Sequence, residues 1–359
     1  MIEQNKFLRG IFFIMIFFAA VLFCFLLKIM DSFFKPVVLS VLLSFVFYPF
    51  IKTLNNKTKL PWWISIFVVY IIFFIVLFLI MNLLGSSFKS IVFSIPKYQE
   101  KFQVIVENLK LTFSSDSRVF KFLDFNEEDS LFVNLNNQFN ILEYLRLIAV
   151  NFTTSIVGFM KALFLVVLLS VFLLAEFKKT RKKVNLAFDD NNNLRVVHVV
   201  QNIISDTTHY ASIKFVISLM TGLLVFLACL LTRLDFALIW GFLAFCLNFI
   251  PTFGSIASSL IIIVFAIIQF YPSWIATLFL SLWIVAVNFV LGNVVEPKIE
   301  GENLGISPFV ILVALSFAGW IWGVLGMILA VPMLVIVKII CENISFLKPI
   351  AVFLGNKTE

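Results

Sequence analysis

The segment NFVLGNVVEPKIEGENLGISPFVILVALSFAGWIWGVLGMILAVP (Asn288–Pro332) joins two apolar runs through a polar break, GNVVEPKIEGENLG. The second run is itself interrupted by residues that disturb helices: Pro308, Gly319, Gly323, Gly326 and Pro332. A segment that only crosses lipid is a smooth apolar helix, because non-helical backbone at membrane depth must be buried in protein or line a watered cavity. The interruptions therefore mark a candidate functional site.

The composition around this segment is that of a membrane protein. Of 359 residues, 62% are hydrophobic and 13% are charged, and the mean hydropathy is +1.07. A soluble domain carries about 25% charged residues. Apolar runs long enough to cross a hydrocarbon core of about 30 Å recur along the chain. We expect an all-α polytopic membrane protein with about eight to ten membrane segments.

The order of these runs suggests six regions. The apolar run Ile11–Leu27 lacks a small-residue cleavage site after it, so we interpret it as an uncleaved first span. The amphipathic spacing after residue 85 predicts an extracytoplasmic helical insertion rather than a span. The predicted regions are three spans (1–85), the insertion (86–146), a fourth span (147–175), a basic cytoplasmic loop (176–210), a transport region (211–341) and a cytoplasmic tail (342–359).

Two apolar blocks, 236–271 and 306–341, are too long for one ordinary span each. The first is broken by NFIPTFG (248–254) and the second by AGWIWG (318–323). Each block is therefore either two tight crossings or a re-entrant, hairpin-like pair of helices. In both cases the chain returns to the side from which it entered.

The basic residues predict the orientation. If the N-terminus is cytoplasmic, the short loops and tail assigned to the inside hold 14 Lys and Arg, whereas the short outer loops hold three, Lys28, Lys35 and Arg233. This asymmetry satisfies the positive-inside rule. It predicts that both termini are cytoplasmic. It also predicts that each broken block, together with the span before it, crosses in the opposite direction to the other, which is the pattern of an inverted repeat in a secondary transporter.

At the interrupted segments the chain resembles the autoinducer-2 exporter (AI-2E) family of permeases. The motifs that carry the resemblance are PTFGS (251–255), EPKIEG (296–301), LGISP (304–308) and GVLGMILAVP (323–332). The resemblance covers nearly the whole chain and implies a permease of the bacterial inner membrane. It also implies either autoinducer-2 export or sodium/proton antiport. The acidic residues Glu300 and Glu302 around Gly301 depart from the family pattern, so the resemblance gives no expectation for the charge of the solute.

The breaks and the polar residues beside them supply the candidate solute or ion path. Pro251 and Gly254 disturb the backbone, and freed carbonyls there could bind a cation or a polar solute, although a tight turn between spans explains the motif equally well. Intramembrane Asn is either a solute ligand or a hydrogen-bonding bridge between helices. Glu296 is either a proton or cation site with Lys298 as local partner, or a solvated carboxylate. The candidates are Asn248, Pro251, Thr252, Gly254, Asn288, Asn293, Glu296, Pro297, Lys298 and Gly301. We expect the site to be a space between the two broken blocks, lined mainly by their tips at residues 248–254 and 318–323.

A second group of residues is predicted to act in hinges or close helix packing. Glycine allows two helices to approach closely, and proline ends or kinks a helix. These residues are Gly305, Pro308, Gly319, Gly323, Gly326 and Pro332. Lys161 lies one turn from the end of its span, from where its side chain can reach the membrane surface.

Other chemistry has no support in the sequence. There is no phosphate-binding loop and no Ser-His-Asp set, so we predict no enzymatic activity and no cofactor. Cys24, Cys229, Cys246 and Cys341 show no metal-ligand spacing, and the two histidines, His198 and His209, are expected to be solvated, so no metal site is predicted. The net charge of +7 is explained by loop placement and not by nucleic-acid binding.

Three functions remain open at this point. The first is a secondary transporter that exports a small polar solute by alternating access of the region 211–341 against the rest. The second is a sodium(cation)/proton antiporter on the same scaffold, and the third is a membrane scaffold without transport. The expected partners are the lipid bilayer, a small polar solute, Na⁺ or H⁺, and, through the amphipathic insertion, further copies of the chain in a homo-oligomer.

Overall fold

The fold is that of a computed structural model, which describes residues 14–15, 18–19, 21–112, 158–177, 194–300, 305–344 and 347–355. Part of the predicted first span, most of the predicted insertion and the basic cluster after residue 177 lie outside the described residues. The regular structure of the described residues is helical, with no strand among them.

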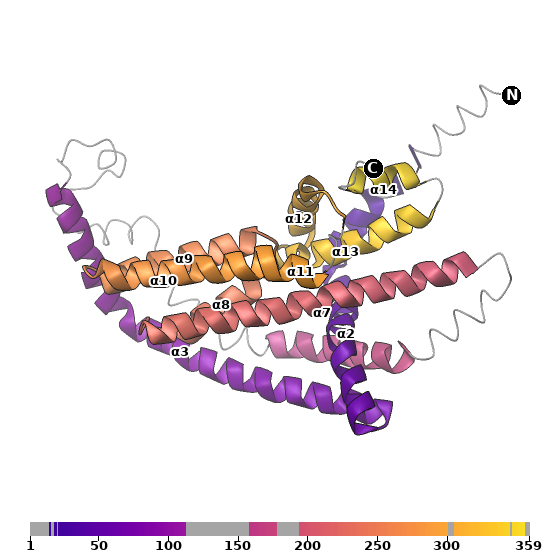
Figure 1. The fold of residues 1–359 in the computed structure, drawn as a ribbon, viewed down its shortest axis with the longest axis horizontal. Coiled ribbons are helices and arrows are strands. Elements are labelled where there is room, and N and C mark those ends of the chain that lie inside the picture. Colours follow the sequence, from indigo (N-terminus) through magenta and orange to yellow (C-terminus); the bar gives the residue numbers. More distant parts are fainter. Residues whose placement is uncertain are drawn as a thin grey trace. The chain divides into compact units, whose positions relative to one another are not determined.

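Seven of the described helices are long and apolar enough to cross a membrane. The helices are α2 (Asp31–Thr58), α3 (Trp62–Thr112), Gly158–Phe177, α7 (Leu194–Leu231), α8 (Ala237–Leu247), α9 (Phe253–Phe270), α10 (Trp274–Phe289), the π-helix η1 (Val290–Val295), α11 (Glu296–Glu300), α12 (Pro308–Trp322), α13 (Val324–Asn343) and α14 (Lys348–Leu354) (Figure 1). The prediction of an all-α polytopic membrane protein is confirmed.

Two helices extend well past the predicted ends of their spans. α3 continues without a break from Trp62 to Thr112, so the boundary placed at residue 85 falls inside one helix. α7 likewise joins the predicted basic loop (176–210) to the predicted transport region (211–341) in one helix. A helix satisfies its own backbone inside and outside lipid, so a change in composition along it does not require it to end.

The two apolar blocks are broken close to the predicted positions. α8 and α9 are separated by the turn Asn248–Thr252, and α12 and α13 by the single residue Gly323. Gly323 has φ +65° and ψ −143°, a backbone conformation that is essentially restricted to glycine. Each block is thus a pair of packed helices and not one long span.

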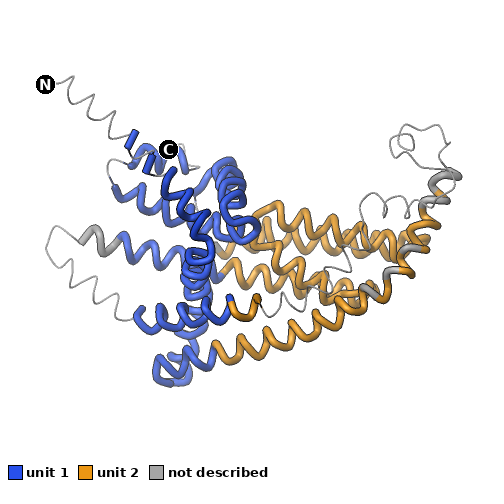
Figure 2. The backbone as a smooth tube through the Cα atoms, turned by 180° about the vertical axis from the view of Figure 1, so that it is seen from behind, with its two compact units in different colours: residues 1–69, 162–212, 302–359 blue, residues 70–161, 213–301 orange. Residues whose placement is uncertain are grey.

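The chain divides into two compact units (Figure 2). Unit 1 comprises residues 1–69, 162–212 and 302–359, and unit 2 comprises residues 70–161 and 213–301. The α12–α13 pair belongs to unit 1 and the α8–α9 pair to unit 2.

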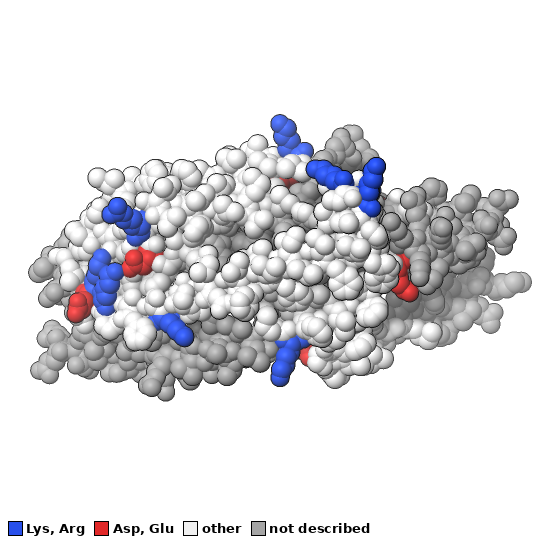
Figure 3. Space-filling model, turned by 90° about the horizontal axis from the view of Figure 1, so that it is seen from below, with Lys and Arg blue, Asp and Glu red and all other residues white. Residues whose placement is uncertain are grey.

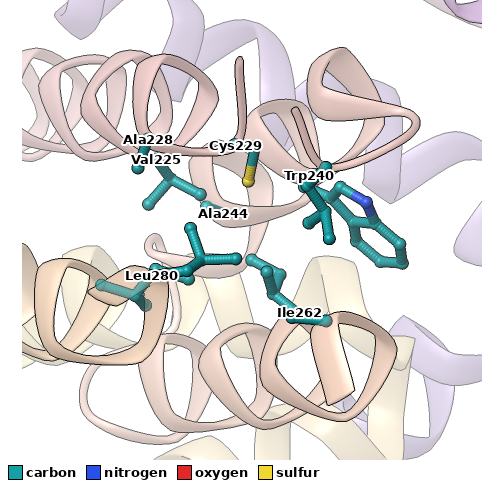
Figure 4. Close-up of a cluster of buried hydrophobic side chains, with 10 residues drawn as sticks. Val225, Ala228, Cys229, Trp240, Ala244, Ile262 and Leu280 are labelled. Carbon is teal, nitrogen blue, oxygen red and sulfur yellow. The ribbon is translucent and has the colours of Figure 1, made fainter. Parts of the chain in front are cut away.

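The core of unit 2 lies where α7, α8, α9 and α10 meet. Small residues at this junction let the helices approach, and branched side chains fill the remaining space (Figure 4). The buried members are Val225, Ala228, Cys229, Leu234, Trp240, Ala244, Ile262, Ala266, Leu280 and Ile284. On α10 the opposite face carries exposed Leu278, Leu282, Val285 and Phe289. Such an apolar outer face is expected of a helix whose solvent is lipid.

The molecular surface agrees with this interpretation. On the face drawn in Figure 3, charged side chains stand at a few separate points, with uncharged atoms between them. Large apolar side chains are exposed on most of the long helices, including α3, α7 and α10. Patches of this extent on a soluble monomer would be unusual, so they indicate the lipid-facing surface.

A close helix crossing in unit 2 joins α7 to α8 through two glycines. A Cβ atom on Gly222 would lie 2.7 Å from the carbonyl oxygen of Gly241, and a Cβ on Gly241 would lie 2.6 Å from the Cβ of Phe226. Both contacts involve backbone or the base of a side chain, which cannot move aside easily. The crossing therefore requires glycine on both helices.

A polar cluster holds the extension of α3 beyond its apolar part. Lys97 and Tyr98 donate hydrogen bonds to the carboxylate of Asp235, with Lys97 Nζ 2.8 Å from Oδ2. Lys101 donates to the carbonyl of Gln269, whose side-chain oxygen accepts the backbone N–H of Asp235 at 2.8 Å. We call these five residues the Asp235 clasp.

The clasp is built around an ionised carboxylate. Burial by itself would raise the pKa of Asp235, but the hydrogen bonds from Lys97 and Tyr98 and the charges of Lys97 and Lys101 outweigh it and hold that pKa below its ordinary value. Burial and the neighbouring Asp235 carboxylate raise the pKa of Tyr98, which keeps its hydroxyl protonated as a donor.

In unit 1, the α12–α13 pair is tightened by small residues. A Cβ on Gly326 would clash with the carbonyl of Ala318, and one on Gly319 would lie 2.7 Å from Cε of Met327. Trp322 donates its indole N–H to the carbonyl of Leu27 at 2.9 Å. Gly326 is therefore sterically required, whereas a larger residue at Gly319 needs only the flexible end of Met327 to move.

We predict that Gly222→Ala and Gly241→Ala each destabilise the protein by about 1–3 kcal/mol, the usual cost of overpacking a tight site. Thermal unfolding in detergent measures the effect. Gly85→Ala is the matched control, because no atom lies within 4 Å of a Cβ built there. Equal melting temperatures for all three variants would contradict the close crossing.

The clasp gives a pH prediction. Because the folded pKa of Asp235 lies below its unfolded value, its contribution to stability is fully present above the unfolded pKa and is lost as pH falls through the folded one. The distribution of distances between spin labels at Val104→Cys and Ser273→Cys should keep its width from about pH 8 to about pH 5 and broaden only below about pH 4. Adding Asp235→Asn should broaden it already at neutral pH. Broadening that begins near neutral pH in the unchanged clasp would refute this assignment.

Candidate functional site

Unit 2 contains a buried pair of opposite charges. Nζ of Lys214, on α7, lies 2.5 Å from Oε1 of Glu296, the first residue of α11. The two side chains are only 7% and 15% exposed. The carboxylate that the sequence singled out is therefore buried and paired. Its cation is Lys214, whereas the sequence suggested Lys298, whose side chain is exposed.

The helical lengths measured from the pair match the thickness of a membrane. At 1.5 Å per residue, α7 runs about 26 Å from Lys214 to its end at Leu231, and the helical stretch from Trp274 to Glu296 spans about 33 Å. Both lengths are close to the core thickness of about 30 Å. The pair thus sits at the end of the bundle away from the α7–α8 turn.

Polar side chains continue along the same face of α7. Lys214, Ser218 and Thr221 follow at spacings of four and three residues, which places them on one face, and all three are buried. Ser218 Oγ accepts a hydrogen bond from Nδ2 of Asn248 at 3.1 Å, and Thr221 donates to the carbonyl of Ile217. This buried polar stripe was the available sequence signal for Lys214, and sequence analysis missed it.

A second bridge links α9 and α10. Nδ2 of Asn288 donates to Oγ of Ser259 at 2.9 Å, and Ser259 donates to the carbonyl of Ser255 at 2.7 Å. Of the two roles considered for the asparagines, the structure displays the bridging one for both Asn248 and Asn288. We call Lys214, Ser218, Thr221, Asn248, Ser259, Asn288 and Glu296 the polar set of unit 2.

The α8–α9 turn satisfies its own backbone. The carbonyls of Ile250, Pro251 and Thr252 each accept a backbone N–H from within the turn or from the start of α9. Gly254 is buried, and a Cβ there would overlap the carbonyl of Leu247, so only glycine fits. Thr252 is exposed with φ +63°. These three carbonyl oxygens therefore already accept hydrogen bonds, which makes them weaker candidates for binding a cation.

A π-helix sets the direction of Glu296. In η1 the hydrogen bonds reach five residues back, and the N–H of Glu296 bonds to the carbonyl of Leu291. The wider turn changes which face the following residues present, and π-turns recur at functional sites. Asn293 and Pro297 are exposed, and Gly301 lies outside the described residues.

The remaining predicted residues lie in unit 1, in the segment that leads into α12, in α12 itself, at the α12–α13 junction and in α13. Gly305 has φ +59°, Pro308 is the first residue of α12, and Pro332 is buried inside α13. Because the two broken blocks lie in different units, a solute space enclosed by both stays a prediction. Within the described residues, no group of three or more His, Cys, Asp or Glu could hold a metal ion.

Comparison with known proteins gives the family of this chain. The model of the AI-2E family, described as AI-2E family transporter, matches residues 11–346. A "Putative transport protein" of Borreliella burgdorferi is 32% identical over 329 residues, covering 92% of this chain and 86% of the relative.

Two further relatives come from other bacteria. The AI-2 transport protein TqsA of Escherichia coli K12 is 26% identical over 328 residues, or 89% of each chain. A "Putative transport protein" of Haemophilus influenzae is 27% identical over 332 residues, again 89% of each. With a family match over nearly its whole length and seven apolar helices, this chain belongs to the AI-2E transporter family and is a multi-pass membrane protein with a role in transport.

Proposed function

We propose that this protein is a secondary transporter of the bacterial inner membrane that exports a small polar solute by alternating access. The observation that carries the proposal is the buried Lys214–Glu296 pair. Removing two charges from water costs several kcal/mol per ion, and their attraction often does no more than offset this cost. Charged residues within membrane segments typically mark solute or ion pathways.

The rest of the polar set supports a polar solute. The hydroxyls of Ser218, Thr221 and Ser259 and the amides of Asn248 and Asn288 can exchange their present partners for those of a solute. The name of the Escherichia coli relative, AI-2 transport protein TqsA, makes autoinducer-2 or a related metabolite the first solute to test.

The helix breaks between α8 and α9 and between α12 and α13 are consistent with the conformational change that alternating access requires. In the proposal, the α8–α9 and α12–α13 pairs change position during the cycle, with Gly323 as a hinge that no side chain obstructs. The inverted repeat, a cytoplasmic location of both termini and a homo-oligomeric state belong to the same proposal, and the positive-inside asymmetry favours this orientation.

Cation/proton antiport is the second candidate, favoured by the carboxylate of Glu296. A buried carboxylate held by one lysine can release that partner when it binds a proton or a cation. In an antiporter the Lys214–Glu296 contact would open once in every transport cycle. In an exporter the two charged side chains could bind the solute directly.

Glu296→Gln tests the role of the pair. We predict that flux of autoinducer-2 in proteoliposomes falls to background, while stability falls by about 3–5 kcal/mol because Lys214 is left buried without a counter-charge. Glu342→Gln is the matched control, since its pair with Lys338 is more exposed, 3.5 Å long and worth under about 1 kcal/mol.

A double variant separates transport from folding. Lys214→Met/Glu296→Met replaces the pair by apolar side chains of similar length and should recover the stability lost in Glu296→Gln, because apolar replacement of a buried pair is often neutral. Flux should stay at background. A double variant that transports normally would remove the pair from the mechanism.

Ion flux distinguishes the two candidates. In proteoliposomes with an internal pH indicator, an imposed sodium gradient should move no protons if the protein is a solute exporter. Sodium-driven proton movement that Glu296→Gln abolishes and Glu342→Gln preserves would establish antiport instead.

A further inference from the structure

The last helix, α14, lies close to the end of a membrane span. α13 has 20 residues and is therefore about 30 Å long, the thickness of the hydrocarbon core. It ends at Asn343, and α14 begins at Lys348. The short connection keeps α14 near the membrane boundary.

One side of α14 is fastened to unit 1. Ala351 is buried, and the carbonyl of Leu354 accepts the backbone N–H of Ser307 at 2.9 Å. Ile306 and Gly355 form an isolated antiparallel bridge. Through these contacts α14 holds residues 305–307, which lead into α12.

The opposite side of α14 is apolar and exposed. Phe353 and Val352 are 83% and 69% exposed, and Ile350 is also exposed. On a helix, Phe353 projects about 200° away from Ala351, so it points away from the protein contact. None of the described residues covers these side chains.

We propose that α14 lies in the membrane interface, with Val352 and Phe353 inserted at the boundary between lipid headgroups and acyl chains. The occupant of this face is the lipid surface, because α14 packs against α13 and follows directly after the end of that span. An amphipathic helix in this position buries its apolar face shallowly and keeps its charge, here Lys348, at the headgroups. The tail is then a surface anchor that holds the loop into α12 at the lipid boundary.

The first test measures the depth of Phe353. Protein carrying Phe353→Cys, labelled with an environment-sensitive fluorophore and placed in lipid nanodiscs, should show several-fold stronger quenching by lipids brominated on their acyl chains than protein labelled at Asn56→Cys in the exposed polar end of α2. The unsubstituted protein, labelled in parallel, corrects for the native cysteines. Equal quenching at the two sites would overturn the proposal.

A second copy of the chain is the competing occupant. In that case Phe353→Cys would cross-link between copies, and its fluorescence would depend on the number of copies per nanodisc and not on lipid bromination. Single-copy nanodiscs that keep the bromine quenching support the lipid surface, and loss of quenching in them overturns it.

A second measurement tests the link to α12. Val352→Ser/Phe353→Ser should accelerate amide hydrogen exchange at Ser307 several-fold in nanodiscs, because its acceptor is the carbonyl of Leu354. Exchange at Ile217, in the buried part of α7, serves as the internal reference. Faster exchange at Ser307 with no change at Ile217 supports the anchor. Unchanged exchange at Ser307 would contradict the anchoring role, because α14 would then hold the loop without inserting into lipid.

Discussion

A peptide group in the hydrocarbon core has no water with which to form hydrogen bonds, and this constraint underlies the fold. Helices satisfy it internally, which explains why regular structure in the described residues is helical. Each break must satisfy it in another way. In the α8–α9 turn the carbonyls of Ile250, Pro251 and Thr252 accept nearby backbone N–H groups, Gly323 joins two helices with one residue, and Ser307 donates to the carbonyl of Leu354. Because these backbone groups already have partners, the polar chemistry of the candidate site comes mainly from side chains.

The Lys214–Glu296 pair is the clearest case of such chemistry. A largely buried pair is weak evidence of stabilisation, because desolvation offsets most of the attraction. Its two residues come from segments 82 positions apart, and the π-helix before Glu296 sets the direction of the carboxylate. A costly pair that depends on an unusual helical turn is more readily explained by function than by folding.

Packing in this protein follows the rules of helices in lipid. Glycines bring α7 and α8 together at Gly222 and Gly241, and buried hydroxyl and amide groups bridge neighbouring helices. Large apolar side chains point outward on the same helices. The Asp235 clasp, beyond the apolar part of α3, uses ionised groups because water competes there and the charges need not be fully desolvated.

The sequence by itself determined the features that depend on local composition and length. Runs of about 20 apolar residues indicated spans, and proline and glycine indicated breaks at residues 248–254 and 318–323, the second of which the structure narrows to Gly323. Glu296 was also recognisable, as an acidic residue at the end of an apolar run. Tertiary structure decided the rest. Lys214 looked like an ordinary lysine near the start of a span, and only packing of α7 against α11 makes it the partner of Glu296. The two asparagines admitted two roles until their serine partners were placed. The physical reason is that span formation depends on transfer of each segment into lipid, whereas pairing depends on which distant segments meet.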